Sequence, residues 1–325
     1  MPNSPYIVGF GVACIDYIVV APPVEPGEHT HVREFIVQGG GLTGTALVAA
    51  ARLGAHTKIL GRIGDDDIGD QIVEGLNAEG VDTSDLIRVP RGESLLSVVL
   101  VDPQTAERTI YCKPDRNIEC STDLINLDSI EKADVVLLDA HWADGARIVA
   151  RRAKEVGVPI VCDISPNSQT LDIVAMCDYP VVARKAAIAF AGTEDYRLAL
   201  DRLLSLGAKA AVITCGSDGA YYASNSTWGH VPAFEVEAGR IFEVRSWHIH
   251  STWGHVPAFE VEAVDTTGAG DVFHGAFAFG IAKGWDIKDT VRFASAVAAI
   301  KCTKLGGRTG IPTFEETQAF IAARS

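Results

Sequence analysis

Short apolar runs alternate with segments of helical periodicity along most of this chain, and that alternation restricts the folds open to it. The apolar runs fall at residues 6–12, 58–63, 135–138, 159–163 and 210–214, and the clearest helical segments at 43–53, 68–79 and 145–156. Strands that are apolar at every position are typical of parallel sheets buried on both faces. The sequence therefore predicts an α/β fold, with a doubly wound, mostly parallel sheet and helices on both faces.

Two segments interrupt this alternation, because they look like strands with no helix between them. They span about residues 17–38 and 93–114, and a turn is expected in the second at Asp102, Pro103 and Gln104. Such ribbons predict a small β-sheet that projects from the main body as a lid over a site at the strand ends. The alternative is that they extend an edge of the main sheet.

The composition argues against several kinds of partner. The 42 acidic residues outnumber the 28 basic ones, and the formal net charge is -14. This balance disfavours binding to nucleic acid or to anionic membranes, since both need clustered Lys and Arg. No apolar run is long enough to span a bilayer, and seven scattered cysteines without a C-x-x-C pair fit a reducing compartment. We expect a cytoplasmic protein with a single domain over residues 1–325.

A stretch of 13 residues occurs twice without any change, at residues 226–238 and 251–263. Repeats that form a solenoid need several copies, so a tandem duplication is the simplest explanation. We expect one copy to form the strand that precedes Asp265 and the other to loop out, which makes about residues 226–263 a duplicated insert. Surface loops tolerate such insertions at modest entropic cost.

The most informative local motif is the glycine-rich stretch at residues 264–271, which ends in Asp271 and continues into a helix of small residues. Glycines let the backbone turn tightly and present its N–H groups, and the start of a helix adds the positive end of its dipole. The motif therefore predicts an anion hole with a carboxylate beside it. Transfer of a phosphoryl group to a hydroxyl needs both parts, donors for the phosphate charge and a base for the proton.

Three further motifs fit a ligand site but also have simpler explanations. Asp16 follows the first strand, where a carboxylate can accept hydrogen bonds from a sugar or can cap a turn. The glycines at 39–41 open a helix and either admit a ligand or merely connect a strand to it. Thr214 begins the pattern Thr-x-Gly-x-x-Gly after an apolar strand, and this is either a phosphate-binding turn or a plain hairpin turn.

Taken in order, these motifs resemble the ribokinase-like sugar kinases, also called the phosphofructokinase B family. The resemblance covers nearly the whole chain outside the duplicated insert, and its second half is the more specific. Residues 264–276, together with 301–303 and 306–312, are most similar to the sulfofructose kinases within that family.

The resemblance implies a role for each matching position. Asp271 would be the general base, and the anion hole would be formed by Gly268, Ala269 and Gly270. The residues implied to bind the sugar are Asp16, Gly40, Gly41, Thr45 and His141. The residues implied to bind ATP are Thr214, Gly216, Gly219, Ala298 and Gly307. Mg²⁺ would arrive with ATP, a monovalent cation such as K⁺ would lie beside the loop at 265–268, and the lid would form a homodimer.

The chain departs from the family pattern at three places. Thr45 stands where Asn is frequent. Residues 183–186 read Ala-Arg-Lys-Ala in place of the usual Asn-x-x-Glu, so no metal ligand is assigned, and Arg184 or Lys185 is the candidate phosphate contact. His141 lies where a sulfonate would favour Arg. The lid offers three other cations for that purpose, namely Arg33, Lys113 and Arg116.

The resulting prediction is ATP-dependent phosphorylation of a primary hydroxyl of a ketose or ketose-like sugar, with sulfofructose or fructose as candidates. The partners would be this sugar and ATP, without nucleic acid or membrane. Two alternatives remain open: a nucleoside kinase of the same superfamily, and a non-catalytic protein that senses sugars or nucleotides on a kinase fold.

Overall fold

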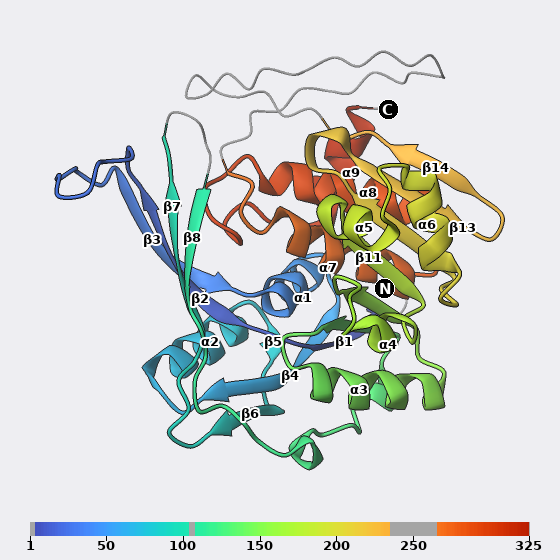
Figure 1. Ribbon diagram of the computed structural model, residues 1–325, viewed down its shortest axis with the longest axis horizontal. Helices are drawn as coiled ribbons and strands as arrows, with labels where there is room; N and C mark the ends of the chain where they lie inside the picture. Colours follow the sequence, from blue (N-terminus) through green and yellow to red (C-terminus); the bar gives the residue numbers. More distant parts are fainter. Residues whose placement is uncertain (1–3, 104–107, 235–264, 325) are drawn as a thin grey trace.

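The computed structural model describes residues 4–103, 108–234 and 265–324 (Figure 1). The strand β14 (Trp228–Val231) lies within the first copy of the repeat. It pairs antiparallel with β13 (Ala220–Ser224) at one edge of the main sheet. The second copy, at 251–263, and the strand expected to precede Asp265 lie outside the described residues.

Within the described residues, the main sheet has ten strands in the order β14-β13-β12-β11-β10-β9-β1-β4-β5, with β6 also beside β4. All neighbouring strands from β12 through β5 are parallel, and only β13 and β14 are antiparallel additions. The strands other than β14 are β1 (Tyr6–Phe10), β4 (His56–Gly64), β5 (Val81–Asp82), β6 (Leu86–Val89), β9 (Val135–Asp139), β10 (Ile160–Asp163), β11 (Tyr179–Ala183), β12 (Ala210–Thr214) and β13 (Ala220–Ser224).

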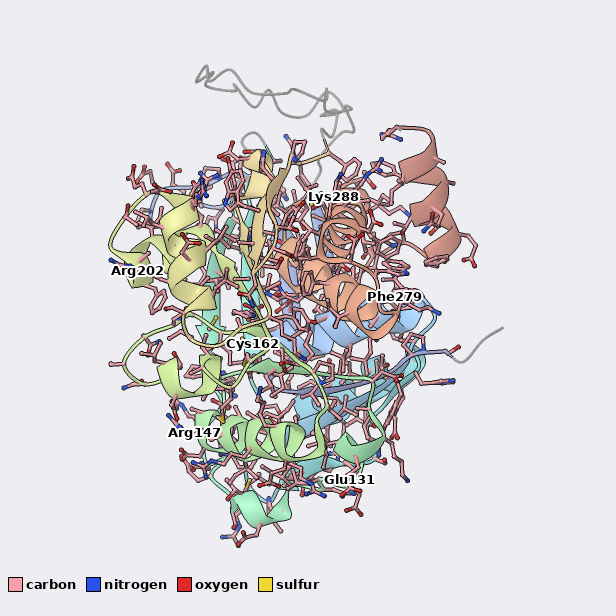
Figure 2. All side chains as sticks on the ribbon, turned by 90° about the vertical axis from the view of Figure 1, so that its right-hand side faces the viewer. Glu131, Arg147, Cys162, Arg202, Phe279 and Lys288 are labelled. Carbon is pink, nitrogen blue, oxygen red and sulfur yellow. The ribbon has the colours of Figure 1, made fainter. Side chains whose placement is uncertain are left out.

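Helices cover both faces of this sheet. One face carries α1 (Leu42–Arg52), α2 (Asp67–Ala78), α7 (Ala269–Ala282) and α8 (Ile287–Lys301), with α9 (Phe314–Ala322) packed on α8. The other face carries α3 (Ala143–Val156), α4 (Leu171–Val174), α5 (Arg184–Ala191) and α6 (Tyr196–Leu204). In Figure 2, Cys162 of β10 lies between the helices that carry Arg147 and Arg202 and the helix that carries Phe279. The predicted doubly wound fold is confirmed.

The ribbon segments form a separate sheet in the order β3-β2-β7-β8, and not an extension of the main one. Its strands are β2 (Cys14–Val20), β3 (Glu34–Gly40), β7 (Leu96–Val101) and β8 (Arg108–Lys113). Ile18, Val99 and Val101 form a small apolar cluster within it. The sheet projects from the main body as predicted (Figure 1), and its base, at the start of β2 and the end of β3, lies next to α1.

Close packing of α7 on α1 brings the glycine-rich motif to the lid base. Gly275 lies against the carbonyl of Ala46, and a Cβ at position 275 would overlap that oxygen. Small residues let two helices approach closely. The first turn of α7 can therefore lie near Leu42, where α1 begins. The fold thus places Asp271, in the first turn of α7, beside the start of the lid.

Candidate active site

Acidic side chains from four elements converge where strands of the main sheet end. Asp139 ends β9, Asp163 ends β10, Asp16 lies in β2 and Asp271 in the first turn of α7. The other three carboxylates all act to raise the pKa of Asp271, which shows that they are near it. The carboxyl ends of parallel strands are where α/β sheets bind ligands.

The start of α7 has the geometry of an anion site. Gly268 is its N-cap in the left-handed region, with φ of 73°, and no side chain caps the helix. A Cβ at position 268 would lie 3.0 Å from Gly307, so the two glycines pack closely, while the space in front of Gly270 is open. An uncapped helix start presents backbone N–H groups and the positive end of its dipole to a ligand.

Asp271 differs from an ordinary carboxylate. Its pKa is raised to about 7, first by burial and then by repulsion from Asp163, while His274 opposes the rise. His274 is held one turn along α7, with Nδ1 2.7 Å from the carbonyl oxygen of Gly270 and 3.4 Å from Oδ2 of Asp163. A carboxylate with a pKa near neutrality can both accept and release a proton at physiological pH.

The structure brings Asp16, Gly40 and Gly41 together. A Cβ on Gly40 would overlap the Asp16 carboxylate, so the close approach of β3 to this carboxylate requires glycine there. Gly41 has a φ of 85° and turns the chain from β3 into α1. Asp16 is only 9% exposed, and burial raises its pKa.

His141 lies apart from this group. Its Nε2 is 2.9 Å from Oδ2 of Asp115, and its backbone N–H donates to Oδ1 of Asp139 at 2.9 Å. It lines a small cavity together with Arg62 and Trp142. The Arg62 guanidinium stacks 4.6 Å above the Trp142 ring, so this cavity holds an arginine to which the sequence motifs assign no role.

The Asp139 carboxylate is structural, because neighbouring N–H and O–H groups already donate hydrogen bonds to both of its oxygens. It is completely buried and accepts hydrogen bonds from the Val12 N–H at 2.7 Å, Thr43 Oγ1 at 2.8 Å and the His141 N–H. This carboxylate fixes the end of β1, the start of α1 and the position of His141.

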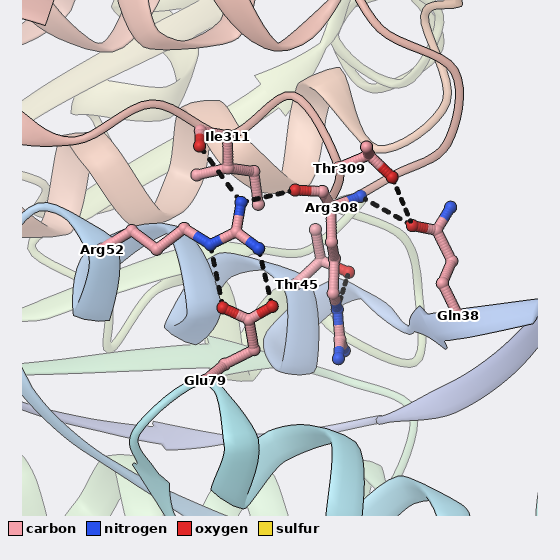
Figure 3. Close-up of polar contacts among 7 residues, drawn as sticks. All are labelled: Gln38, Thr45, Arg52, Glu79, Arg308, Thr309 and Ile311. Atoms are coloured by element: carbon pink, nitrogen blue, oxygen red, sulfur yellow. Dashed lines mark hydrogen bonds and ion pairs between the residues drawn. The ribbon is translucent and has the colours of Figure 1, made fainter. Parts of the chain in front are cut away.

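Arg308 is a residue at this site to which the sequence motifs assign no role. It is 5% exposed, and its Nη2 donates to the Gly40 carbonyl at 2.8 Å. Its Nε lies 3.4 Å from Thr45 Oγ1 (Figure 3). Burial lowers the pKa of Arg308 to about 10. The guanidinium therefore remains charged at neutral pH and joins two of the predicted sugar-binding positions.

A second arginine holds the loop that carries Arg308. Arg52 Nη1 donates to the carbonyl oxygens of Arg308 at 2.8 Å and Ile311 at 3.1 Å, and its Nη2 pairs with Glu79 at 2.6 Å (Figure 3). In the sequence, the network is represented only by Arg52 near the end of a predicted helix and by Arg308 after two glycines. Only the fold, which brings residues 256 positions apart into contact, reveals it.

The predicted nucleotide positions fall in two places, the turn after β12 and the region of α8 and the loop that follows it. Thr214 ends β12, and Gly216 and Gly219 have φ values of 59° and 82° in the turn that follows. Arg184, at the start of α5, donates to the Cys215 carbonyl at 2.7 Å and pairs with Asp218 of the same turn. The helix of Ala298, α8, packs against β13 and β14, and Gly307 packs against Gly268.

Comparison with known proteins assigns the fold to a class of phosphotransferases. The chain is 26% identical to a ribokinase structure from Thermotoga maritima, with a TM-score of 0.77 over 98% of this chain and 99% of that one. It is 28% identical to the ribokinase of Bacillus subtilis over 95% of this chain and 97% of the relative, and 26% identical to "Probable fructokinase-5" of Arabidopsis thaliana over the whole of both chains.

The pfkB family carbohydrate kinase profile matches residues 4–239 and 244–314. The chain belongs to this family, and it is an ATP-dependent carbohydrate kinase, as its motifs predicted. Among the described residues, no helix is long and apolar enough to cross a membrane.

Proposed function

We propose that this kinase transfers the γ-phosphoryl group of ATP to a primary hydroxyl of a ketose or ketose-like sugar, with Asp271 as the general base. The observation that carries the proposal is the position of Asp271, whose pKa is about 7, in the uncapped first turn of α7. A base is most effective when its pKa lies near the working pH, and such a group contributes about 10²–10⁴-fold to the rate.

The reaction proceeds by in-line displacement. Asp271 takes the proton as the sugar oxygen attacks the γ-phosphorus, and the bond from that phosphorus to the ADP oxygen breaks. Backbone N–H groups of Gly268, Ala269 and Gly270 stabilise the charge on the transferred group. Asp16, Thr45 and the turn at 40–41 hold the sugar hydroxyls, and Arg308 keeps Thr45 and that turn in place.

ATP would bind at Thr214, Gly216, Gly219, Ala298 and Gly307, between the β12–β13 turn and α8. Mg²⁺ neutralises the phosphate oxygens when it is bound. It needs only one or two carboxylates besides those oxygens. The partly exposed Asp163 at the end of β10 is the carboxylate that would face it.

The cavity beside His141 supports a sugar with an anionic substituent, such as sulfofructose. Position 141 carries His where a sulfonate would favour Arg, and Arg62 supplies a guanidinium in its place. The Nε of Arg62 is buried without a hydrogen-bond partner among the described residues. Buried polar groups normally have partners, and a sulfonate oxygen would supply one. A sugar without the charge, such as fructose, would leave this nitrogen unpaired.

The lid supports dimer formation. Phe35 and Val37 on β3 and Ile110 and Tyr111 on β8 are between 44% and 59% exposed. Large apolar side chains gathered on one small sheet are typical of a protein interface. We therefore propose a homodimer formed through the lid.

A panel of acceptors tests the proposed function. ADP release would be measured with fructose, sulfofructose, other ketoses and nucleosides, and the phosphorylated position would be identified by NMR. The proposal predicts turnover with a ketose or its sulfonated form and phosphate on a primary carbon. Turnover with nucleosides alone would favour a nucleoside kinase, and sugar binding without turnover would favour a sensor.

A further inference from the structure

A fully buried ammonium group lies under the catalytic loop. Lys301 is the last residue of α8 and has 0% of its surface exposed. Its Nζ donates to the backbone carbonyl of Asp265 at 2.8 Å. Lysine is almost never fully buried without a partner, so this side chain has a specific role that the proposed mechanism has not used.

Asp265 connects this ammonium to the anion site. Its Oδ1 accepts from the Thr267 N–H and its Oδ2 from the Gly306 N–H, both at 2.8 Å. Its own N–H donates to the Cys302 carbonyl at 3.2 Å. The segment that enters α7 is therefore fixed to the end of α8 through one residue, and Lys301 holds the carbonyl of that residue.

The surroundings of Lys301 suit a cation. The C-terminal end of α8 carries the negative end of the helix dipole, and the Asp265 carboxylate and carbonyl lie beside it. Burial lowers the pKa of Lys301, while Asp265 and, more weakly, Cys302 and Asp271 oppose the change. Arg108 of β8, which donates to Thr266 Oγ1, also faces this place.

The family resemblance predicts a K⁺-like ion beside the same loop, and the residues present do not fit a second cation. An ion about 4 Å from the ammonium would be repelled strongly enough, at the effective dielectric of a protein, to weaken its binding on the order of a thousandfold. The Asp265 carboxylate already balances the charge of Lys301, so no further positive charge is needed for neutrality.

We propose that the Lys301 ammonium is a tethered substitute for an exchangeable monovalent cation, and that this kinase therefore works without K⁺ or Na⁺. Lys301 is a positioning residue. It holds the Asp265 carbonyl, and through Asp265 the turn at 266–268 and the first turn of α7, in the arrangement that receives the phosphoryl group. The inference rests on the proposed function, because it assigns this loop to phosphoryl transfer.

The wild-type enzyme provides the first test. Turnover and thermal unfolding would be measured in KCl, NaCl and tetramethylammonium chloride at equal ionic strength, with ATP as a tetramethylammonium salt. The proposal predicts rates within about twofold of each other and the same Tm in all three salts. Activation by K⁺ of more than about fivefold, or a Tm raised by K⁺ alone, would overturn it.

Lys301→Ala and Lys301→Met separate the charge from the volume of the side chain. We expect Lys301→Ala in tetramethylammonium chloride to lose kcat on the order of 10²-fold, with the KM for ATP changed little. K⁺, ammonium or methylammonium should restore much of the rate and raise the Tm of this variant. Lys301→Met fills the space without charge, so it should lose kcat and gain nothing from the ions.

Lys304→Ala is the matched control, because Lys304 lies three residues further along the chain, just after α8, but is exposed. It should keep wild-type kcat and Tm in every salt. Wild-type activity in Lys301→Met would overturn the proposal. The Tm measurements do not need a substrate, so the cation result stands apart from a failure to find the sugar, and the wild-type comparison decides even if neither variant folds.

Discussion

The proposed sugar end and the proposed nucleotide end of the candidate site are built in different ways. At the sugar end, Asp16, Asp271 and Arg308 are charged side chains whose pKa values are shifted by burial. At the nucleotide end, the proposed contacts come mainly from the backbone, which Gly216 and Gly219 turn with positive φ. The charged pair there, Arg184 with Asp218, is partly exposed.

This difference implies that the buried charges determine the rate of the reaction and the binding of the sugar, whereas the backbone turn determines the binding of the nucleotide. Buried charges act strongly because the protein interior screens them less than water does. A backbone turn binds phosphate through N–H groups that any sequence with suitable glycines can present. Substitutions at the sugar end should therefore alter kcat or the sugar KM, and those at the nucleotide end should alter the ATP KM or stability.

The largest expected effect comes from Asp271→Asn. The amide cannot take the sugar proton, so kcat should fall about 10²–10⁴-fold. The side chain keeps its size, and ATP affinity, measured by calorimetry without sugar, should remain that of the wild type. Retention of more than a tenth of the wild-type kcat would remove Asp271 from the role of base.

Arg308→Lys should have the next largest effect. Lysine keeps the charge but cannot donate in the planar, forked arrangement that reaches both Gly40 and Thr45. Loss of hydrogen bonds from a charged group costs about 1.5–3 kcal/mol, so the sugar KM should rise about 10–100-fold while the ATP KM stays constant. Steady-state kinetics with each substrate varied in turn measures this split.

The neighbouring Thr309→Ala serves as the control for Arg308→Lys. Thr309 is exposed, and its hydroxyl lies 3.4 Å from Gln38 Oε1. It should change neither KM by more than about twofold, as surface substitutions usually have little effect. An equal rise in both KM values for Arg308→Lys would mean that the arginine supports the whole fold rather than the sugar end.

Gly219→Ala and Gly216→Ala should show a smaller effect at the nucleotide end. Both glycines have positive φ, which in the left-handed helical region costs an alanine about 1–2 kcal/mol. Gly219, with ψ of -140°, lies near the region that essentially only glycine adopts. A Cβ at 219 would also overlap the Val231 carbonyl, whereas one at 216 meets open space. Gly219→Ala should therefore be about 1–3 kcal/mol less stable to urea than Gly216→Ala, and equal unfolding midpoints would contradict the structure.

The features that could be predicted from sequence are those encoded locally. Residues 210–214 form β12 at the predicted bounds, because four of the five are apolar and a short apolar run suits a strand buried on both faces. The fold class followed from such runs. The helix bounds moved by one or two residues, as with α3, which begins at Ala143 instead of residue 145.

The missed residues depend on long-range contacts. Lys301, Arg62 and Arg308 look like ordinary surface cations in the sequence. Lys301 and Arg308 are buried because α8 meets Asp265 and the C-terminal loop meets Gly40 and Thr45. Arg62 is half-buried, and its Nε is enclosed beside Trp142. His141 shows the opposite case, since its position at a strand end was predictable but its contact with Asp115 was not. Local pattern predicts the element on which a residue lies, and packing decides what the side chain contacts.

The pH dependence of kcat/KM for the sugar, measured between pH 5.5 and 9, tests the central claim most directly. Asp271 must be ionised to act as a base, and its raised pKa of about 7 means that it becomes protonated below neutrality. The account predicts a rate that is level above pH 8 and falls about tenfold per unit well below pH 7, with this fall absent from the residual activity of Asp271→Asn. A wild-type profile that stays level down to pH 5.5, or the same fall in the variant, would contradict it.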